Sequence, residues 1–367
     1  MRAGDEAEIF LIFAGVLGAV VGSFLNVCIY RMPRGIGLAE PRRSFCPSCR
    51  KTIQWFENLP VVSWLLLRGR CSTCGERIPA RYLVVELLTA VLFAWSWSVW
   101  GVPLALVYWV LISLLVTGSF IDIEHFIIPD ELTLGGLAAG LVFSVALPSL
   151  HGVETFWEGG AAGLSGALAG LGLLWLVVEG GKLAFGRKRH RFEPPVAFEW
   201  RRDGERAEME LGGERLGWED AFSRARDVVR VEGEKFQLDG RAVQGPLNFF
   251  YDRLVVGEET YSLKNLLRVE GVARSITLPR EAMGLGDVKL LGAIGAFLGW
   301  KAVVFTIFSG SVLGCVAAAV GIFSARDHTG VRLPFGPFLS AGAVIWILGG
   351  DRLAEWYFEA LKGGLPG

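Results

Sequence analysis

Two aspartates stand at the borders of apolar segments in distant parts of the chain. Asp122 follows a run without Asp, Glu, Lys or Arg, 101–121, and Asp287 follows Gly284-Leu285-Gly286 and opens another apolar segment. Ionisable groups in or beside membrane spans cost free energy, so they are candidates for function. Two carboxylates that share one proton are the minimal apparatus of an aspartic protease. The structural alternative is that Asp122 is simply the first polar residue after a span and that Asp287 caps a helix.

Five further residues stand close to these aspartates or within other apolar segments. Gly284 and Gly286 allow close approach of a substrate backbone or a second helix, and unusual backbone dihedral angles. Lys289 and Glu86 interrupt apolar segments, and we expect them to pair with other groups, line the site or bind the substrate terminus. Asp130 opens an apolar segment, where it fits a helix N-cap, and supporting the site or binding substrate is the alternative for this residue. Spacing alone leaves two possibilities: an aspartic protease, or a transporter with a proton relay through the same charged residues.

The composition is that of a membrane protein: 52% of the residues are hydrophobic and the mean hydropathy is +0.44. Eight apolar segments reach or approach the roughly 20 residues that a helix needs to cross a bilayer. They are 9–30, 82–100, 101–121, 132–150, 159–178, 288–300, 302–325 and 333–350. The first is preceded by acidic residues and followed by no cleavage site, so we interpret it as a retained span. We therefore expect an all-α polytopic membrane protein with about eight transmembrane helices.

Basic residues predict the orientation of these helices. Arginine and lysine gather in 31–81 and 187–191 and at Arg326 and Arg332. The short loops that alternate with these three basic loops along the chain carry almost none. With eight spans, the three basic regions lie on one side, which the positive-inside rule makes the cytoplasm. The N-terminus then lies outside, and Asp122 and Asp287 both lie at the cytoplasmic face.

Four cysteines predict a metal site in the loop after the first span. Cys46 and Cys49 form one CxxC pair and Cys71 and Cys74 form another. Four thiolates at this spacing suit one tetrahedral zinc ion, and a cytoplasmic setting argues against disulfides. Because four cysteines leave no open coordination position, such a zinc would be structural. A redox dithiol is the alternative. The loop itself is either a rigid structural element that organises the chain or a surface that docks a substrate or partner.

The segment 187–283 differs from the rest in carrying charges of both signs and short apolar alternations. We expect a β-rich cytoplasmic insertion with short helices over 221–229 and 263–267. Hairpin turns are expected where alternating residues run into Gly212-Gly213, Asp239-Gly240 and Gly257-Glu258. Arg-Val-Glu-Gly occurs at both 230–233 and 268–271, a weak sign of two related halves. A solvated module without an assigned purpose is the simplest interpretation, and a regulatory or partner-binding role is the alternative.

Together these motifs resemble the type IV prepilin peptidases, the bifunctional leader peptidase/N-methyltransferases. The matching blocks, besides the two CxxC pairs, are Gly22-Ser23-Phe24-Leu25-Asn26-Val27, Tyr30-Arg31-Met32-Pro33, Arg81-Tyr82, Val85-Glu86, Asp122-Ile123-Glu124, Pro129-Asp130-Glu131-Leu132-Thr133, Gly284-Leu285-Gly286-Asp287-Val288-Lys289-Leu290 and Pro334-Phe335-Gly336-Pro337-Phe338. They divide the chain into a first span (1–30), a zinc loop (31–81), spans two to five (82–186), the insertion (187–283) and spans six to eight (284–367).

The resemblance implies that Asp122 and Asp287 are the catalytic pair, the second within the GxGD motif of intramembrane aspartyl proteases. Such enzymes cut the basic leader from type IV prepilins and pseudopilins at the cytoplasmic face of the bacterial inner membrane. They then methylate the new N-terminus from S-adenosylmethionine. Expected partners are these substrates, membrane lipid, and the type IV pilus or type II secretion machinery, without nucleic acid. The methyltransferase activity rests on the resemblance alone and has no assigned residues. The insertion departs from the usual family member and could gate Asp287.

Two other classes of function remain as alternatives. A proton-coupled transporter would use the carboxylates as a relay and would show no proteolysis. A scaffold for a secretion machine would depend on the zinc loop and would tolerate loss of the carboxylates.

Overall fold

The computed structural model describes residues 3–40, 43–185, 187–203, 206–222, 227–279, 284–324 and 333–363. Arg326 and Arg332, which contribute to the orientation prediction, lie outside these residues. The chain forms two compact units. One is helical and comprises Met1–Trp175 and Gly284–Gly367; the other, Leu176–Met283, contains a β-sheet.

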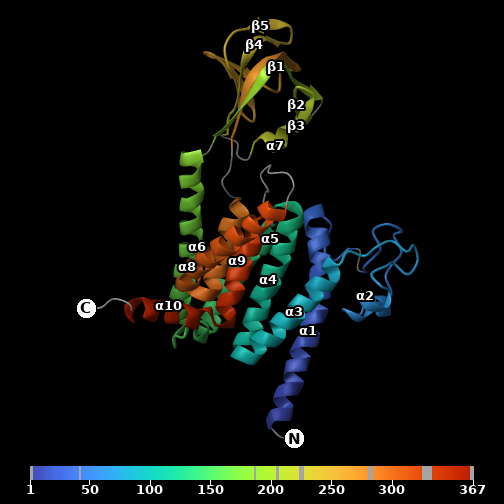
Figure 1. Cartoon of the computed structure of the whole chain (residues 1–367), viewed down its shortest axis with the longest axis vertical. Helices are drawn as coiled ribbons and strands as arrows, with labels where there is room; N and C mark the ends of the chain where they lie inside the picture. Colours follow the sequence, from blue (N-terminus) through green and yellow to red (C-terminus); the bar gives the residue numbers. More distant parts are fainter. Residues whose placement is uncertain are drawn as a thin grey trace. The chain divides into compact units, whose positions relative to one another are not determined.

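Long apolar helices make up the helical unit (Figure 1). They are α1 (Ala3–Arg31), α3 (Arg81–Trp100), α4 (Leu104–His125), α5 (Asp130–Ala146), α6 (Phe156–Phe185), which continues into the second unit, and α8 (Leu285–Ser324). Shorter elements are η1 (Met32–Arg34), η2 (Trp55–Asn58), α2 (Val62–Leu66), η3 (Pro148–His151), α9 (Gly336–Ile345), the π-helical η4 (Trp346–Gly350) and α10 (Asp351–Gly363).

Five of the described helices, α1, α3, α4, α6 and α8, are long and apolar enough to cross a membrane. In α8, Gly299 has a left-handed φ of 80° and interrupts the helix at the border between two of the predicted spans. α5 has 17 residues and α9 has 10, both shorter than a full crossing. The described part of the chain is therefore a mostly helical membrane protein with five candidate spans, against the eight that the apolar runs predict.

α4 occupies the centre of the helical unit, where it contacts α1, α3, α5 and α9 (Figure 1). α8 packs against α5 and α9, so α4 and α8 share two neighbours. Small residues permit the closest approaches: a Cβ at Gly22 of α1 would lie 2.8 Å from the Cα of Glu86 on α3. Where lipid surrounds the helices, such contacts and interhelical hydrogen bonds hold a bundle together. One such bond runs from the Ser144 hydroxyl to the Ala296 carbonyl at 2.8 Å.

The second unit contains a nine-stranded antiparallel sheet in the order β3-β2-β1-β9-β4-β6-β7-β8, with β5 paired to β4. The strands are β1 (Arg187–Asp203), β2 (Arg206–Leu211), β3 (Glu214–Gly217), β4 (Val229–Leu238), β5 (Arg241–Val243), β6 (Leu247–Phe249), β7 (Arg253–Val256), β8 (Glu259–Ser262) and β9 (Arg268–Pro279), and α7 (Trp218–Ala221) lies between β3 and β4. β1 and β9, the first and last strands of the insertion, are neighbours, so the chain leaves the sheet beside the strand by which it enters.

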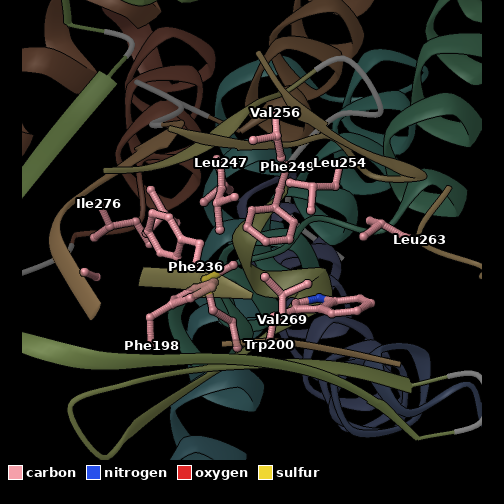
Figure 2. Close-up of a cluster of buried hydrophobic side chains, with 14 of the residues drawn as sticks. Phe198, Trp200, Phe236, Leu247, Phe249, Leu254, Val256, Leu263, Val269 and Ile276 are labelled. Atoms are coloured by element: carbon pink, nitrogen blue, oxygen red, sulfur yellow. The ribbon is translucent and has the colours of Figure 1, made fainter. Parts of the chain in front are cut away.

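Alternate residues of these strands point into one apolar core. Figure 2 shows Phe198 and Trp200 of β1, Phe236 of β4 and Phe249 of β6 gathered there, all buried. Burial alternates at both ends of β4, as expected for a sheet with one covered face, and the alternation is interrupted between them where the register with β9 shifts. The insertion therefore has a hydrophobic core of its own.

The turn predictions for the insertion are confirmed, and a predicted helix is wrong. Gly212-Gly213, Asp239-Gly240 and Gly257-Glu258 connect β2 to β3, β4 to β5 and β7 to β8, and all but Glu258 have positive φ angles. Residues 263–267 form a turn because Leu263 and Leu266 are drawn into the core of the sheet. In the other predicted helix, 221–229, α7 ends at Ala221 and β4 begins at Val229, and 223–226 lie outside the described residues. The repeated Arg-Val-Glu-Gly segments lie on the adjacent strands β4 and β9, and their common origin stays a prediction.

Candidate active site

Asp122 lies in the last turn of α4, the helix at the centre of the bundle, and its side chain is buried. The helix ends directly after it, because Phe126 adopts a left-handed conformation (φ 55°) and donates its backbone N–H to the Asp122 carbonyl at 2.9 Å. The carboxylate itself accepts a hydrogen bond at Oδ2 from the backbone N–H of Gly336, 3.0 Å away. Gly336 is the first residue of α9. The N-terminus of α9 therefore faces the Asp122 carboxylate.

Asp287 lies in the first turn of α8 and is also buried. Its Oδ1 atom is shielded from solvent and has no hydrogen-bond partner among the described residues. Gly286, which precedes Asp287, and Gly336, which donates its N–H to Asp122, both lie against Ile128. Packing thus brings two buried carboxylates from distant parts of the sequence to one site, where α4 ends and α8 begins.

Ile128 packs against the backbone at the start of α8 and at the start of α9. A Cβ at Gly286 would lie 3.1 Å from the Ile128 Cβ, and a Cβ at Gly336 would lie 2.9 Å from its Cδ1. Gly286 therefore permits a close approach to the segment before α5, whereas the sequence predicts an approach to a substrate backbone or a second helix. Gly284 is exposed, and the nearest atom to a Cβ there is Asp287 Oδ2 at 3.9 Å. The left-handed backbone that glycine allows occurs at neither Gly284 nor Gly286.

Lys289 and Asp130 form an ion pair, with 2.6 Å between Nζ and Oδ1. The N-cap interpretation of Asp130 is wrong: Pro129 holds that position, without a side-chain cap, and Asp130 is the first residue of α5. Its carboxylate is therefore free to reach the first turn of α8. The pair connects the beginnings of α5 and α8 beside Asp287.

Glu86 of α3 is buried, and its hydrogen bonds go to the cysteine loop and to α1. Oε2 accepts the backbone N–H of Val61 at 2.7 Å, and the Ser23 side chain is a second partner. Val61 precedes α2 with a φ of 63°, so the carboxylate holds a strained turn of the loop. Glu86 fastens the loop to the helices.

The four predicted metal ligands do meet. The thiol groups of Cys46, Cys49, Cys71 and Cys74 lie within 4.8 Å of one another, and no other such cluster occurs in the described part of the chain. The sulfurs of Cys46 and Cys74 are 3.8 Å apart. A tetrahedral zinc with bonds of about 2.3 Å would hold its sulfurs about 3.8 Å apart, so the cluster fits this ion.

Both CxxC pairs are built on the same turn. Cys46 donates its N–H to the Lys51 carbonyl, and Cys71 donates to the Glu76 carbonyl, each at 2.9 Å. The fourth residue after each first cysteine, Arg50 or Gly75, has a positive φ and donates back to that cysteine's carbonyl. Backbone N–H groups of Cys74 and Thr73 lower the pKa of the Cys71 thiol to about 6, which favours a thiolate ligand. The repetition gives the cluster the symmetry of a four-sulfur metal site.

Two features of the site go beyond the sequence predictions. The first is the hydrogen bond from Gly336 to Asp122, which only the block Pro334-Phe335-Gly336-Pro337-Phe338 hinted at, since its prolines and glycine mark the turn before α9. The second is an ion pair between Arg81 and Glu124 that joins the start of α3 to the end of α4. Opposite charges at the ends of adjacent spans were the available signal for this pair.

Comparisons with known proteins agree with this architecture. Residues 16–100 match the bacterial peptidase A24 N-terminal domain, and residues 109–189 and 262–319 match the type IV leader peptidase family. The residues between the last two ranges, which form much of the sheet, lie outside the match. No solved structure shows a significant match to the chain.

Several curated relatives carry the description prepilin leader peptidase/N-methyltransferase. One from Aeromonas hydrophila is 29% identical over 366 residues, covering 92% of this chain and 90% of the relative. One from Pseudomonas putida is 28% identical over 380 residues, covering 95% of this chain and 93% of the relative. One from Myxococcus xanthus (strain DK1622) is 44% identical over 149 residues, covering 39% of this chain and 43% of the relative. The family resemblance of the motifs is confirmed, and the chain belongs to the type IV leader peptidase family, that of the prepilin leader peptidase/N-methyltransferases.

Proposed function

We propose that this protein is a prepilin leader peptidase/N-methyltransferase whose catalytic pair is Asp122 and Asp287. It removes the basic leader from type IV prepilins or pseudopilins and then methylates the new N-terminus. The observation that supports the peptidase assignment is that the end of α4 and the start of α8, which carry the buried Asp122 and Asp287, both pack beside Ile128. Two neighbouring buried carboxylates cannot both be ionised cheaply, so we infer that the pair holds one proton.

We infer different roles for the two carboxylates, and their surroundings support this. Asp122 faces the N-terminus of α9 and accepts the Gly336 N–H, an arrangement that favours a carboxylate anion. Asp287 is buried and its Oδ1 lacks a partner among the described residues, which favours the neutral acid. We infer that Asp122 takes a proton from the attacking water. Asp287 polarises the scissile carbonyl and helps to protonate the leaving amine, as general acid–base catalysis requires.

The proposed setting is the bacterial inner membrane, which the chain crosses eight times, with the N-terminus outside and the aspartates at the cytoplasmic face. The proposed division of the chain is the one that the sequence predicts: 1–30, 31–81, 82–186, 187–283 and 284–367. The basic residues of 31–81 and 187–191 support this orientation. A prepilin carries an apolar helix behind a basic leader, so a site at the cytoplasmic membrane edge meets the bond between them. The pilus and secretion machinery that use such substrates are the expected partners.

Two small-molecule components accompany this proposal. Cys46, Cys49, Cys71 and Cys74 would hold one zinc ion, which keeps 31–81 folded and leaves no position for a reacting water. S-adenosylmethionine is the proposed methyl donor for the second activity.

The test is cleavage of a purified prepilin by the solubilised wild type, Asp122→Asn and Asp287→Asn. Asp252→Asn is the matched control, since Asp252 is exposed in the connection between β6 and β7. We expect cleavage by the wild type and the control, and a loss of at least about a thousandfold in each active-site variant, because neither half of the pair can be replaced by an amide. Cleavage that survives in either folded variant would contradict the assignment. Proton-driven transport without proteolysis would instead favour the transporter.

A further inference from the structure

A second candidate site lies in the helical unit, apart from the aspartates. It is a cavity of about 360 Å³ between α1, α3 and the cysteine loop. Neither Asp122 nor Asp287 lines it. Its size falls within the range of small-molecule sites in proteins, and its wall combines aromatic and charged side chains. The residues that matter here are Asn26, Val27, Arg31, Tyr82 and Glu86, all of which line it.

The Asn26 side chain has an unsatisfied acceptor in this cavity. Asn26 is 1% exposed and donates Nδ2 to the Tyr82 carbonyl at 3.0 Å. Its Oδ1 has no partner within the described part of the chain. A buried amide oxygen without a donor is costly and uncommon in native proteins. A ligand that brings an N–H or O–H to this oxygen would remove the deficit.

Arg31 is a buried cation whose described partners are all neutral. It is 4% exposed and donates to the backbone carbonyls of Gly37, Leu38 and Arg43 at 3.0–3.3 Å. No ion pair of Arg31 is found among the described residues. The buried carboxylate of Glu86 lines the same cavity. The cavity therefore offers a cation, an anion and an amide acceptor, a set that matches a zwitterionic amino-acid group.

We propose that this cavity binds the methyl donor S-adenosylmethionine, an inference that rests on the proposed function. Arg31 would attract its carboxylate, and Glu86 and Asn26 Oδ1 would accept from its ammonium group. Tyr30, Phe45, Trp64 and Tyr82 supply aromatic surface for the adenine and for the sulfonium cation. The site lies on different residues from the peptidase pair, so the two activities are separable.

The start of α3 links this cavity to the end of α4. Tyr82 lines it and follows Arg81, whose ion pair to Glu124 ties α3 to the turn of α4 that carries Asp122. Cleavage and methylation would then occur at neighbouring helix ends. In the transfer, the amine nitrogen forms a bond to the methyl carbon and the carbon–sulfur bond breaks. The electron pair of the broken carbon–sulfur bond stays on sulfur, and the amine proton passes to water.

The experiment measures binding of S-adenosylhomocysteine, the unreactive product, to the zinc-loaded full-length protein in detergent by calorimetry. Val27→Phe would fill the cavity, and Asn26→Leu would remove the acceptor. Val20→Phe is the matched control, because Val20 is on the same helix, half exposed and not part of the lining. We expect at least about tenfold weaker binding in Val27→Phe and about fivefold in Asn26→Leu, with wild-type affinity in Val20→Phe. Zinc content and melting temperature verify the fold.

A photoreactive S-adenosylmethionine analogue tests the same site in the wild type, without any substitution. Crosslinks that map to 23–31 or 82–86 support the inference, and crosslinks confined to other segments overturn it. Unchanged binding in both cavity variants would also overturn it. A wild type that binds the product yet cuts no prepilin would refute the peptidase proposal and leave this site standing. A wild type that cuts and methylates while the cavity variants bind normally would refute this site alone.

Discussion

The carboxylate of Asp122 and the backbone N–H of Gly336 are joined by a hydrogen bond of 3.0 Å between distant segments of the chain. The contact leaves no room for a side chain: a Cβ at residue 336 would lie 2.7 Å from Asp122 Oδ2. The absence of a Cβ at this glycine is thus part of how the carboxylate is held.

Gly336→Ala is expected to displace the Asp122 carboxylate and to lower prepilin cleavage about a hundredfold, since small misplacements of a catalytic group cost that much. The measurement is the rate of leader removal by purified variants. Gly135→Ala is the matched control, because a Cβ at Gly135 of α5 meets nothing within 4 Å. Equal rates for the two variants would show that the contact does not position the catalytic group.

The ion pair between Lys289 and Asp130 is expected to matter more for cleavage than for stability. The side chains are 32% and 60% exposed, so the pair contributes less than about 1 kcal/mol to folding. It nevertheless holds the turn that carries Asp287. We expect Lys289→Gln and Asp130→Asn each to slow cleavage about tenfold, with little further loss in the double variant.

Cleavage rates and melting temperatures of the two single variants and the double variant form a cycle that checks this. Lys301→Gln, at an exposed position further along α8, is the control and should cleave as the wild type does. Fully additive losses would mean that the two residues act independently.

Removal of one cysteine ligand is expected to unfold the loop and release the metal. Cys46→Ser should lower zinc content from one ion per chain to near zero, because structural zinc sites fold only with their metal. Cys315→Ser is the control, since Cys315 is exposed and outside the cluster. Elemental analysis measures the zinc, and limited proteolysis of 31–81 measures the folding. Full zinc content in Cys46→Ser would rule out the four-sulfur site.

The sheet of the insertion is expected to depend on its apolar core. Leu247 of β6 is fully buried and Leu267 is 69% exposed, so the pair allows a matched comparison. Leu247→Ala should destabilise the sheet by about 2–5 kcal/mol, whereas Leu267→Ala should change its stability by less than about 0.5 kcal/mol. Hydrogen exchange of 187–279 in the full chain measures the difference. Equal protection in the two variants would contradict the core assignment.

Much of the candidate site could be predicted from sequence because its signals are local. The apolar runs predict helices before Asp122 and after Asp287, and the CxxC spacing predicts four converging thiols. Paired turn residues predict three hairpins of the insertion. Each of these signals comes from a short stretch of chain. Its steric preferences and hydropathy favour the same local structure whatever the distant segments do. The helix predicted at 263–267 failed because Leu263 and Leu266 gain more from the core of the sheet than from a local helix.

The sequence by itself determined the membrane class, the four cysteines that cluster as candidate metal ligands and the two candidate carboxylates, because residue type and spacing suffice for these. Only the tertiary structure decided that the helix ends carrying Asp122 and Asp287 pack beside Ile128, that Gly336 hydrogen-bonds to Asp122, and that Asp130 pairs with Lys289 instead of capping a helix. It also decided which strands of the insertion are neighbours and that α1, α3 and the cysteine loop enclose a cavity. These outcomes depend on which helix and strand surfaces pack together. The free energy of that packing comes from contacts between segments that are far apart in the chain.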